Sequence, residues 1–129
     1  MREIKFRAWD KKFKKMIIPD AVWKSGDISY DTRFYSKDDI ILIQCTGLKD
    51  KNGEEIYEGD IVERYGVLYQ VKFGQFVDVK GYCQCGFYLY DFEEDIILGN
   101  LGYSFIEDNP LKVIGNIFEN PELLKGEER

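Results

Sequence analysis

The chain has no histidine, and it has only three prolines, three cysteines and two methionines among its 129 residues. Without an imidazole, Ser-His-Asp and Cys-His catalysis, a histidine-ligated metal and a histidine pH switch are all excluded. The sequence also has no P-loop and no G-x-G-x-x-G motif, so neither common phosphate cradle is supported. The absences therefore remove several large classes of enzyme.

Long apolar runs are missing as well. No segment approaches the roughly 18 apolar residues that a bilayer-spanning helix needs. The first residues, MREIKFRAWDKK, lack the apolar core of a secretory signal. Three cysteines in a chain without an export signal favour free thiols in a reducing compartment. We expect a cytoplasmic protein that contacts no membrane and needs no cofactor.

An excess of acidic side chains is present, and it is unevenly distributed. The chain has 24 Asp and Glu against 18 Lys and Arg, a net charge of −6. Residues 1–16 hold seven basic and two acidic side chains, a local +5, so the remainder sums to −11. An acidic body speaks against nucleic-acid binding, whereas the basic segment suits an acidic partner.

The hydrophobic pattern is mostly that of β-strands. Alternation over residues 3–10 predicts a strand, and residues 14–18 predict its returning partner in a hairpin. The apolar run 40–45, IILIQC, predicts a strand buried on both faces. Asn52-Gly53 predicts a type I′ hairpin turn. Residues 20–39 read as a long loop with at most a short strand around Ile28–Tyr30.

Further along, short β-branched or aromatic segments alternate with glycines at 66, 74, 81 and 86, which is typical of a meander in a small barrel or sandwich. These segments are residues 61–65, 67–73, 76–82 and 87–92. A last strand over 112–118 contains Gly115, where a bulge or a close backbone approach is expected. Asn120 as N-cap and Pro121 as first residue predict a short helix.

The sequence thus predicts one mainly β domain over residues 1–129. It divides into an N-terminal hairpin and loop region over 1–44, a small barrel over 45–121, and a short helix and tail over 122–129. Residues 96–111 fit neither a helical nor a strand period.

Cys83 and Cys85 form the sharpest candidate for chemistry. Residues two apart in a strand point to one face, so the two thiols are candidate metal ligands. A closed zinc site needs four ligands, and only Cys45 remains as a third thiol. The sequence therefore favours the simpler interpretation, that the two are buried small apolar residues or ordinary thiols beside a glycine turn. Carboxylates cluster at 54–60 and 91–95, but no spacing selects a productive catalytic pair.

Aromatic side chains are abundant, with nine Tyr, nine Phe and two Trp. Tyrosine and tryptophan are enriched in protein interfaces, although tyrosine also suits half-buried strands. Hairpin lysines, in turn, also serve to protect a sheet edge. The candidate interaction residues are Arg7, Trp9, Lys11, Lys12, Trp23, Tyr30 and Tyr35.

Two blocks of the sequence resemble a known family. Residues 46–62, TGLKDKNGEEIYEGDIV, and residues 113–124, VIGNIFENPELL, are similar to the two signatures of the YopX family. Residues 4–10 with Lys15-Met16 fit its start. Residues 63–110 carry no resemblance, so the two cysteines receive no family role. The resemblance implies a small, mostly β protein with an SH3-like barrel, encoded by phages and prophages, without an established activity.

Three functional hypotheses follow. The leading one is a non-enzymatic phage or prophage accessory protein that acts through protein–protein contacts in the host cell, with a host protein or as a homo-oligomer. The second is a nucleic-acid-binding barrel, or an acidic body that mimics nucleic acid. The third is a metal-dependent hydrolase.

Overall fold

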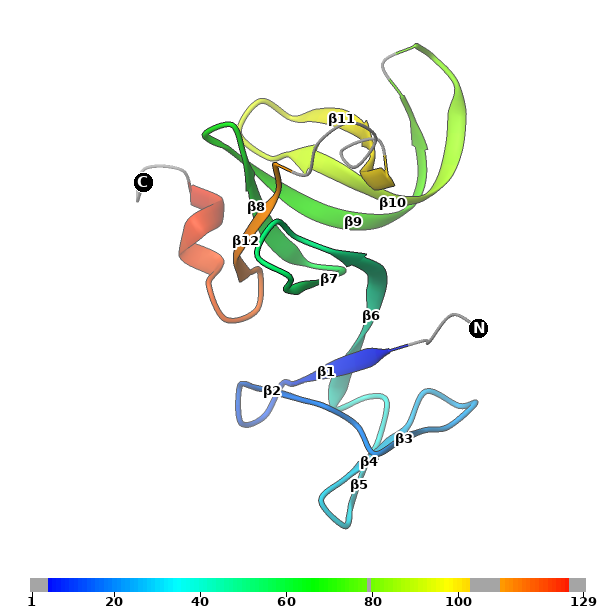
Figure 1. The fold of residues 1–129 in the computed structure, drawn as a ribbon. Coiled ribbons are helices and arrows are strands. Elements are labelled where there is room, and N and C mark those ends of the chain that lie inside the picture. The colour runs from blue at the N-terminus through cyan, green and yellow to red at the C-terminus, as the bar shows by residue number, and fades with distance from the viewer. Residues whose placement is uncertain (1–4, 79, 103–109, 126–129) are drawn as a thin grey trace.

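The computed structural model describes residues 5–78, 80–102 and 110–125. This part of the chain is mainly β and forms three antiparallel sheets. Figure 1 shows an N-terminal sheet below and a strongly curled sheet above, with strand β6 running between them. The predicted fold class is confirmed as mainly β with a partial barrel.

The N-terminal sheet has the strand order β2-β1-β6-β7. Its strands are β1 (Phe6–Asp10), β2 (Lys15–Ile17), β6 (Ile40–Lys49) and β7 (Glu55–Tyr57). The predicted hairpin of β1 and β2 is confirmed, with Trp9 opposite Met16. Burial of the 40–45 run on both faces was a wrong prediction, since the Ile41 side chain is 40% exposed.

The turn between β6 and β7 also differs from its prediction. Gly53 has a positive φ of 84°, but Asn52 does not have a positive φ, so the turn is not type I′. The Asp50 carboxylate accepts hydrogen bonds from the backbone N–H groups of Asn52 and Glu54, both at 2.9 Å. This side-chain bond selects the turn geometry.

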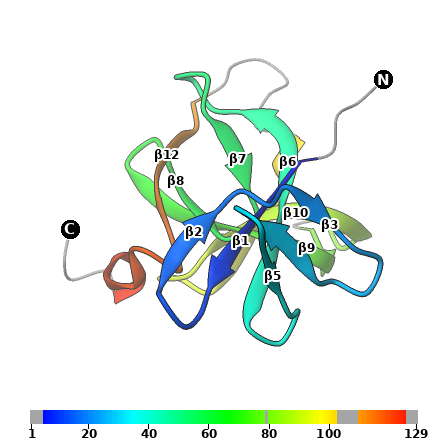
Figure 2. The same ribbon diagram turned by 90° about the horizontal axis from the view of Figure 1, so that it is seen from below.

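Residues 20–39 form a small third sheet where only a loop with one short strand was predicted. Its strands are β3 (Ala21–Val22), β4 (Ile28–Tyr30) and β5 (Arg33–Tyr35), in that order. Asp31 and Thr32 both have positive φ and close a two-residue hairpin loop. Seen from below, β3 and β5 lie in front of the curled sheet together with β1 and β2 (Figure 2).

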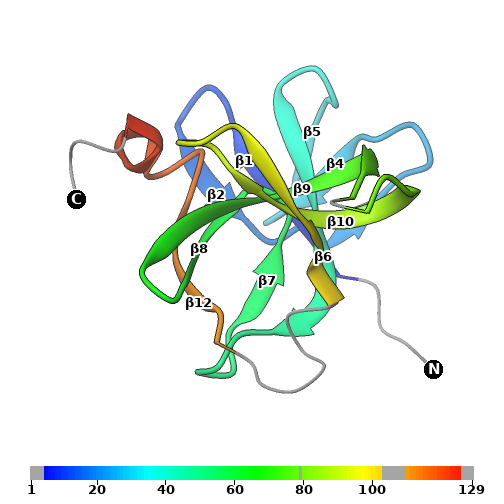
Figure 3. The same cartoon turned by 90° about the horizontal axis from the view of Figure 1, so that it is seen from above.

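The curled sheet has the strand order β11-β10-β9-β8-β12. From above, β8, β9 and β10 form its curved wall (Figure 3). Its strands are β8 (Asp60–Arg64), β9 (Val67–Val77), β10 (Cys83–Asp91), β11 (Ile96–Asn100) and β12 (Lys112–Asn116). The prediction of a strand over 76–82 was wrong, because the chain turns after Val77. Asp78 accepts hydrogen bonds there from the N–H groups of Lys80 and Tyr82.

Three hydrophobic clusters of described residues support these sheets, and the smallest contains Ile43, Cys45 and Tyr57. The core of the curled sheet contains the fully buried side chains Ile56, Val62, Val71, Leu89, Leu101 and Leu111. The N-terminal core joins Ala8, Ile17, Ile28 and Ile40, so the small sheet packs on the β1–β2 hairpin. The inward-facing apolar residues of β9 therefore pack in the core of the curled sheet, and those of β1 pack in the N-terminal core.

The last described segment confirms one expectation and corrects another. A register shift lies between Val113 and Gly115, and a side chain at Gly115 would place its Cβ 2.6 Å from the Asn120 Oδ1 atom. The predicted bulge and close approach are confirmed. Pro121–Lys125 is a 3₁₀ helix, but Asn120 does not cap it through its side chain, which accepts instead from the Asn116 N–H.

Candidate functional site

Arg7 ties the N-terminal sheet to the curled sheet. Its guanidinium forms an ion pair with the Asp60 carboxylate and lies 4.1 Å from the centre of the Tyr57 ring. Asp60 is buried and also accepts a 2.8 Å hydrogen bond from the Tyr57 N–H. Burial raises the pKa of Asp60 to about 6, although Arg7 acts to lower it. Arg7, a predicted interaction residue, is therefore engaged inside its own chain.

Lys5 and Glu55 form a parallel link beside the first. The two side chains are ion-paired, and this contact lowers the pKa of Glu55. The Tyr57 hydroxyl donates to Glu55 Oε2 at 3.3 Å. The Lys5–Glu55 link arises because β1, which Lys5 directly precedes, and β7, which holds Glu55, flank β6 in the same sheet.

The other predicted interaction residues do not gather in one place. Trp9 stacks on Phe118 with ring centres 5.8 Å apart. Lys11 and Lys12 lie exposed in the β1–β2 turn. Tyr30 and Tyr35 are half-buried against the N-terminal core. Of the predicted aromatic residues, Trp23 is the most open to solvent, with 52% of its surface exposed.

An outward aromatic face is present on the small sheet. Ser29 lies opposite both Ala21 and Phe34, so these three residues share one face of the sheet. The Trp23 N–H bonds to the Asp27 carbonyl, which continues the same pairing, and strand alternation therefore places Trp23, two residues after Ala21, on this face too. Phe34 is 66% exposed, whereas Ile28, on the opposite face, is fully buried. We call Ala21, Trp23, Ser29 and Phe34 the aromatic face. The sequence analysis missed Phe34 because the strand around it is only three residues long.

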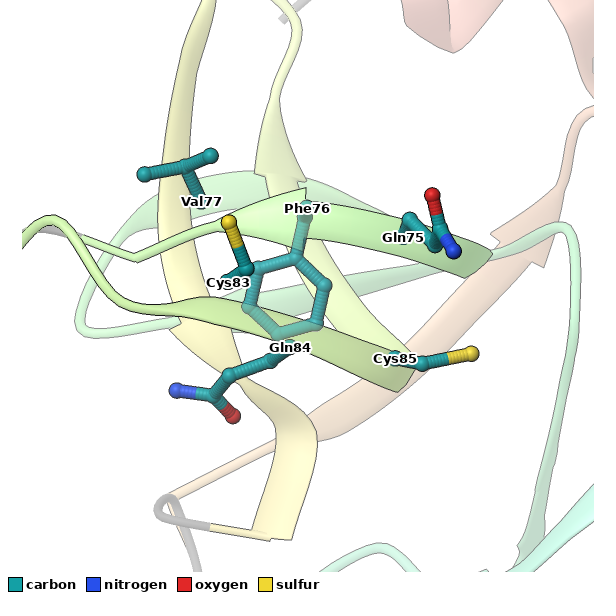
Figure 4. A pocket seen from close by; sticks show the side chains of 6 residues that line it. All are labelled: Gln75, Phe76, Val77, Cys83, Gln84 and Cys85. Atoms are coloured by element: carbon teal, nitrogen blue, oxygen red, sulfur yellow. The ribbon is translucent and has the colours of Figure 1, made fainter.

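The two cysteines lie at the outer end of the β9–β10 hairpin. They line a cleft of about 420 Å³ together with Phe76 and its neighbours (Figure 4). Cys83 pairs with Val77 and Cys85 with Gln75, and both cysteines are exposed. In Figure 4 the two sulfur atoms point away from each other, on either side of Phe76. Within the described ranges, no group of three or more His, Cys, Asp or Glu could hold a metal ion.

A second cavity, of about 420 Å³, lies between β6 and β9, and we call it the β6–β9 cavity. The side chains that matter for its chemistry are Ile41, Glu58, Lys72, Phe73, Tyr88 and Phe118. Glu58 is half-buried, and burial raises the pKa of its carboxyl group. No sequence signal identified Glu58, because its burial depends on β6 and β9 being brought together.

The two sequence blocks singled out earlier meet at the edge of this cavity. Strand β8 of the first block pairs with β12 of the second. Gly59 donates its N–H to the Val71 carbonyl at 2.8 Å and accepts from the Ile117 N–H at 2.9 Å. The Val113 N–H donates to the Asp50 carboxylate at 2.8 Å. The blocks therefore form one continuous structural unit.

These features define a small, mainly β protein in which an N-terminal sheet is tied to a curled half-barrel sheet. The YopX protein family profile matches residues 5–125, so the chain belongs to the YopX family. The predicted family resemblance is thereby confirmed.

Among solved structures, the chain is similar to protein EF1440 from Enterococcus faecalis, seen by crystallography. The two share 26% sequence identity with a TM-score of 0.61, over 96% of this chain and 99% of that one. No curated protein matches this chain. In the described part of the chain, no helix is long and apolar enough to span a membrane.

Proposed function

We propose that this member of the YopX family is a non-enzymatic phage or prophage accessory protein. It acts in the host cytoplasm by binding another protein through the aromatic face. The observation that carries this proposal is the exposure of Trp23 and Phe34 on one side of a sheet whose other side holds the fully buried Ile28. Large exposed aromatic side chains are typical anchors of protein interfaces.

The charge of this region favours an acidic partner. Residues 5–40 contain nine Lys or Arg against six Asp or Glu, whereas the chain as a whole has a net charge of −6. Lys24 and Arg33, next in sequence to the two aromatic anchors, are both exposed. Opposite charges steer two surfaces together and fix their register. A second copy of the chain offers such an acidic surface, so the proposed complex is a homo-oligomer.

The proposal includes an SH3-like barrel for the curled sheet. What supports it is the strand order β11-β10-β9-β8-β12, in which β8 to β11 form a four-strand meander and β8 also pairs with β12, the last strand that the structure describes. In this arrangement the N-terminal sheet lies outside the barrel and is joined to it through β6 (Figure 1).

Light scattering after size-exclusion chromatography tests the proposal directly. The wild-type chain is expected to self-associate with rising concentration and to dissociate as salt is added. The double variant Trp23→Ser/Phe34→Ser is expected to stay monomeric. The matched control is Tyr65→Ser, which removes an equally exposed aromatic side chain, 70% exposed, from the β8–β9 turn. A wild-type chain that is monomeric throughout, or a double variant that associates like wild type, would overturn the proposal.

A further inference from the structure

The position of Glu58 in the β6–β9 cavity is fixed by the backbone around it. The Glu58 N–H donates to the Gln44 carbonyl at 3.0 Å, and the next residue, Gly59, bonds to Val71 and Ile117. The carboxylate itself has no hydrogen-bond or ion-pair partner among the described residues, although the side chain is half-buried. A partly buried charge without a partner is costly in the folded state. The cavity therefore has a preformed position for a positive group.

The walls beside Glu58 are mainly apolar and aromatic. Tyr88 and Phe118 line the cavity, and the stacking of Phe118 on Trp9 holds that ring in place. Phe73 and Ile41 line it too, with 51% and 40% of their surfaces exposed. Aromatic faces attract organic cations, and they do so most strongly where water is excluded. The volume of about 420 Å³ falls within the usual range for small-molecule sites.

The charges around the cavity select a cation over an anion or a metal ion. Lys72 is the other charged residue in the lining, but its ammonium lies 4.3 Å from the centre of the Tyr90 ring and forms no ion pair with Glu58. A bare metal ion would need several carboxylate or thiolate ligands, and the described lining supplies one carboxylate. A cavity of this size is also far larger than an ion requires.

We propose that the β6–β9 cavity binds an organic cation with an apolar body, such as an arylalkylamine, with Glu58 facing the ammonium and the aromatic walls holding the apolar part. This site is separate from the aromatic face, so either proposal can fail alone. The cation can come from a free amine or from a lysine side chain of another protein.

Isothermal titration calorimetry on the full chain tests the site with three probes of similar shape. These are 2-phenylethylamine, the neutral 2-phenylethanol and the anionic 3-phenylpropionate. We expect the amine to bind and the other two to bind at least about ten-fold more weakly, since the charge-assisted contact is lost. Equal affinity of the alcohol and the amine, or no amine binding at all, would overturn the proposal.

Two variants assign the effect to Glu58. Glu58→Gln keeps the shape and is expected to weaken amine binding about ten-fold. The matched control, Glu94→Gln, removes an exposed carboxylate from the β10–β11 turn and is expected to leave binding unchanged. Should Glu58→Gln fail to fold, Tyr88→Leu is expected to weaken the amine more than the alcohol. The assignment would be contradicted if folded Glu58→Gln bound the amine like wild type. If Tyr88→Leu is used in its place, wild-type amine binding by that folded variant would contradict it equally.

Two further measurements complete the test: the pH dependence of amine binding, and the binding of a lysine-containing peptide. The other titratable side chains in the described lining are Lys72 and Tyr88. Amine binding should weaken as the solution is made more acidic, and it should do so at a higher pH than for an ordinary glutamate, because burial raises the pKa of Glu58 and protonation removes its charge. A peptide with blocked termini and one unmodified lysine that binds in place of the amine, and loses affinity in Glu58→Gln, assigns the cation to a protein side chain. Binding of the free amine alone assigns it to a small molecule.

Discussion

The guanidinium of Arg7 reaches across strand β6 to pair with Asp60, a residue 53 positions later in the chain. Asp60 is the first residue of β8, so this pair joins the N-terminal sheet to the curled sheet. The Asp60 side chain is 2% exposed and that of Arg7 is 17% exposed. A pair this deeply buried depends on both partners being present.

Replacing Arg7 by methionine should lower the free energy of unfolding by about 3–5 kcal/mol, because the Asp60 charge would stay buried without a partner. Urea denaturation followed by tryptophan fluorescence measures the loss. Lys12→Met, in the exposed β1–β2 turn, is the control and should change stability by no more than about 0.5 kcal/mol. Equal effects of the two substitutions would show that the pair contributes nothing to stability.

Asp60 should also make stability depend on pH. Its pKa is raised from 3.8 to about 6 in the folded chain, so between these values the folded state binds a proton more readily than the unfolded state. The contribution of Asp60 to the free energy of unfolding therefore grows as pH falls from 7 to 5, by on the order of 1 kcal/mol. Asp60→Asn should remove this increment, which urea titrations at the two pH values would detect.

Other groups do not obscure that measurement. The raised pKa of Glu58 acts in the same direction but is present in both proteins. Glu55 has a lowered pKa, so the stability it contributes is lost only below its ordinary range, outside the window. Identical pH dependence in wild type and Asp60→Asn would contradict the assignment to Asp60.

Gly59 and Gly66 offer a matched test of close packing. Both have positive φ, 87° and 84°, so alanine at either position carries about the same backbone strain. An added Cβ at Gly59 would lie 2.9 Å from the Phe118 ring, whereas at Gly66 it would meet nothing within 4 Å. Gly59→Ala should therefore cost about 1–3 kcal/mol more than Gly66→Ala in thermal or urea unfolding. Equal losses would mean that the Phe118 ring moves aside freely.

Thiol reactivity should separate the three cysteines. Cys83 and Cys85 are exposed at the hairpin end, while Cys45 is buried on β6. Ellman's reagent should therefore titrate two thiols quickly in the native chain and the third only on unfolding. The Cys45→Ser variant should keep the fast phase and lose the slow one. A fast phase of three thiols would show that β6 opens readily.

The sequence predicted most of the longer paired strands, but it missed β11, which lies in a segment that fitted neither a helical nor a strand period. The β1–β2 hairpin was recognised because charged and apolar residues alternate over a full strand. Within residues 20–39 the sequence predicted a short strand only around Ile28–Tyr30, which is β4, because β3 and β5 are two and three residues long and show no period. Turn geometry was equally hard to predict. Both residues of the Tyr65-Gly66 turn have positive φ, whereas in Asn52-Gly53 only the glycine does. The difference arises because the Asp50 carboxylate accepts a hydrogen bond from the Asn52 N–H and fixes that turn.

The candidate sites were less accessible to sequence analysis than the strands. Trp23 was predicted as an interaction residue and is exposed, but its companion Phe34 emerges only when β4 and β5 are paired. Glu58 looked like an ordinary turn carboxylate. Its chemical interest comes from β6 and β9, which are placed around it by contacts distant in sequence. The nucleic-acid and hydrolase hypotheses stay predictions. Among the described residues, we have identified no cluster of side chains on which either could be argued.

The pairing of β8 with β12 has a consequence for the order of events during synthesis. The Asp50 carboxylate meets the Val113 N–H 63 residues further along, and the core around Ile56 is completed by Leu111. The short hairpins can form as they leave the ribosome, but this core cannot close until residues 111–118 have been made. A nascent chain halted near residue 100 should therefore remain sensitive to protease, and the release of those few further residues should make it resistant.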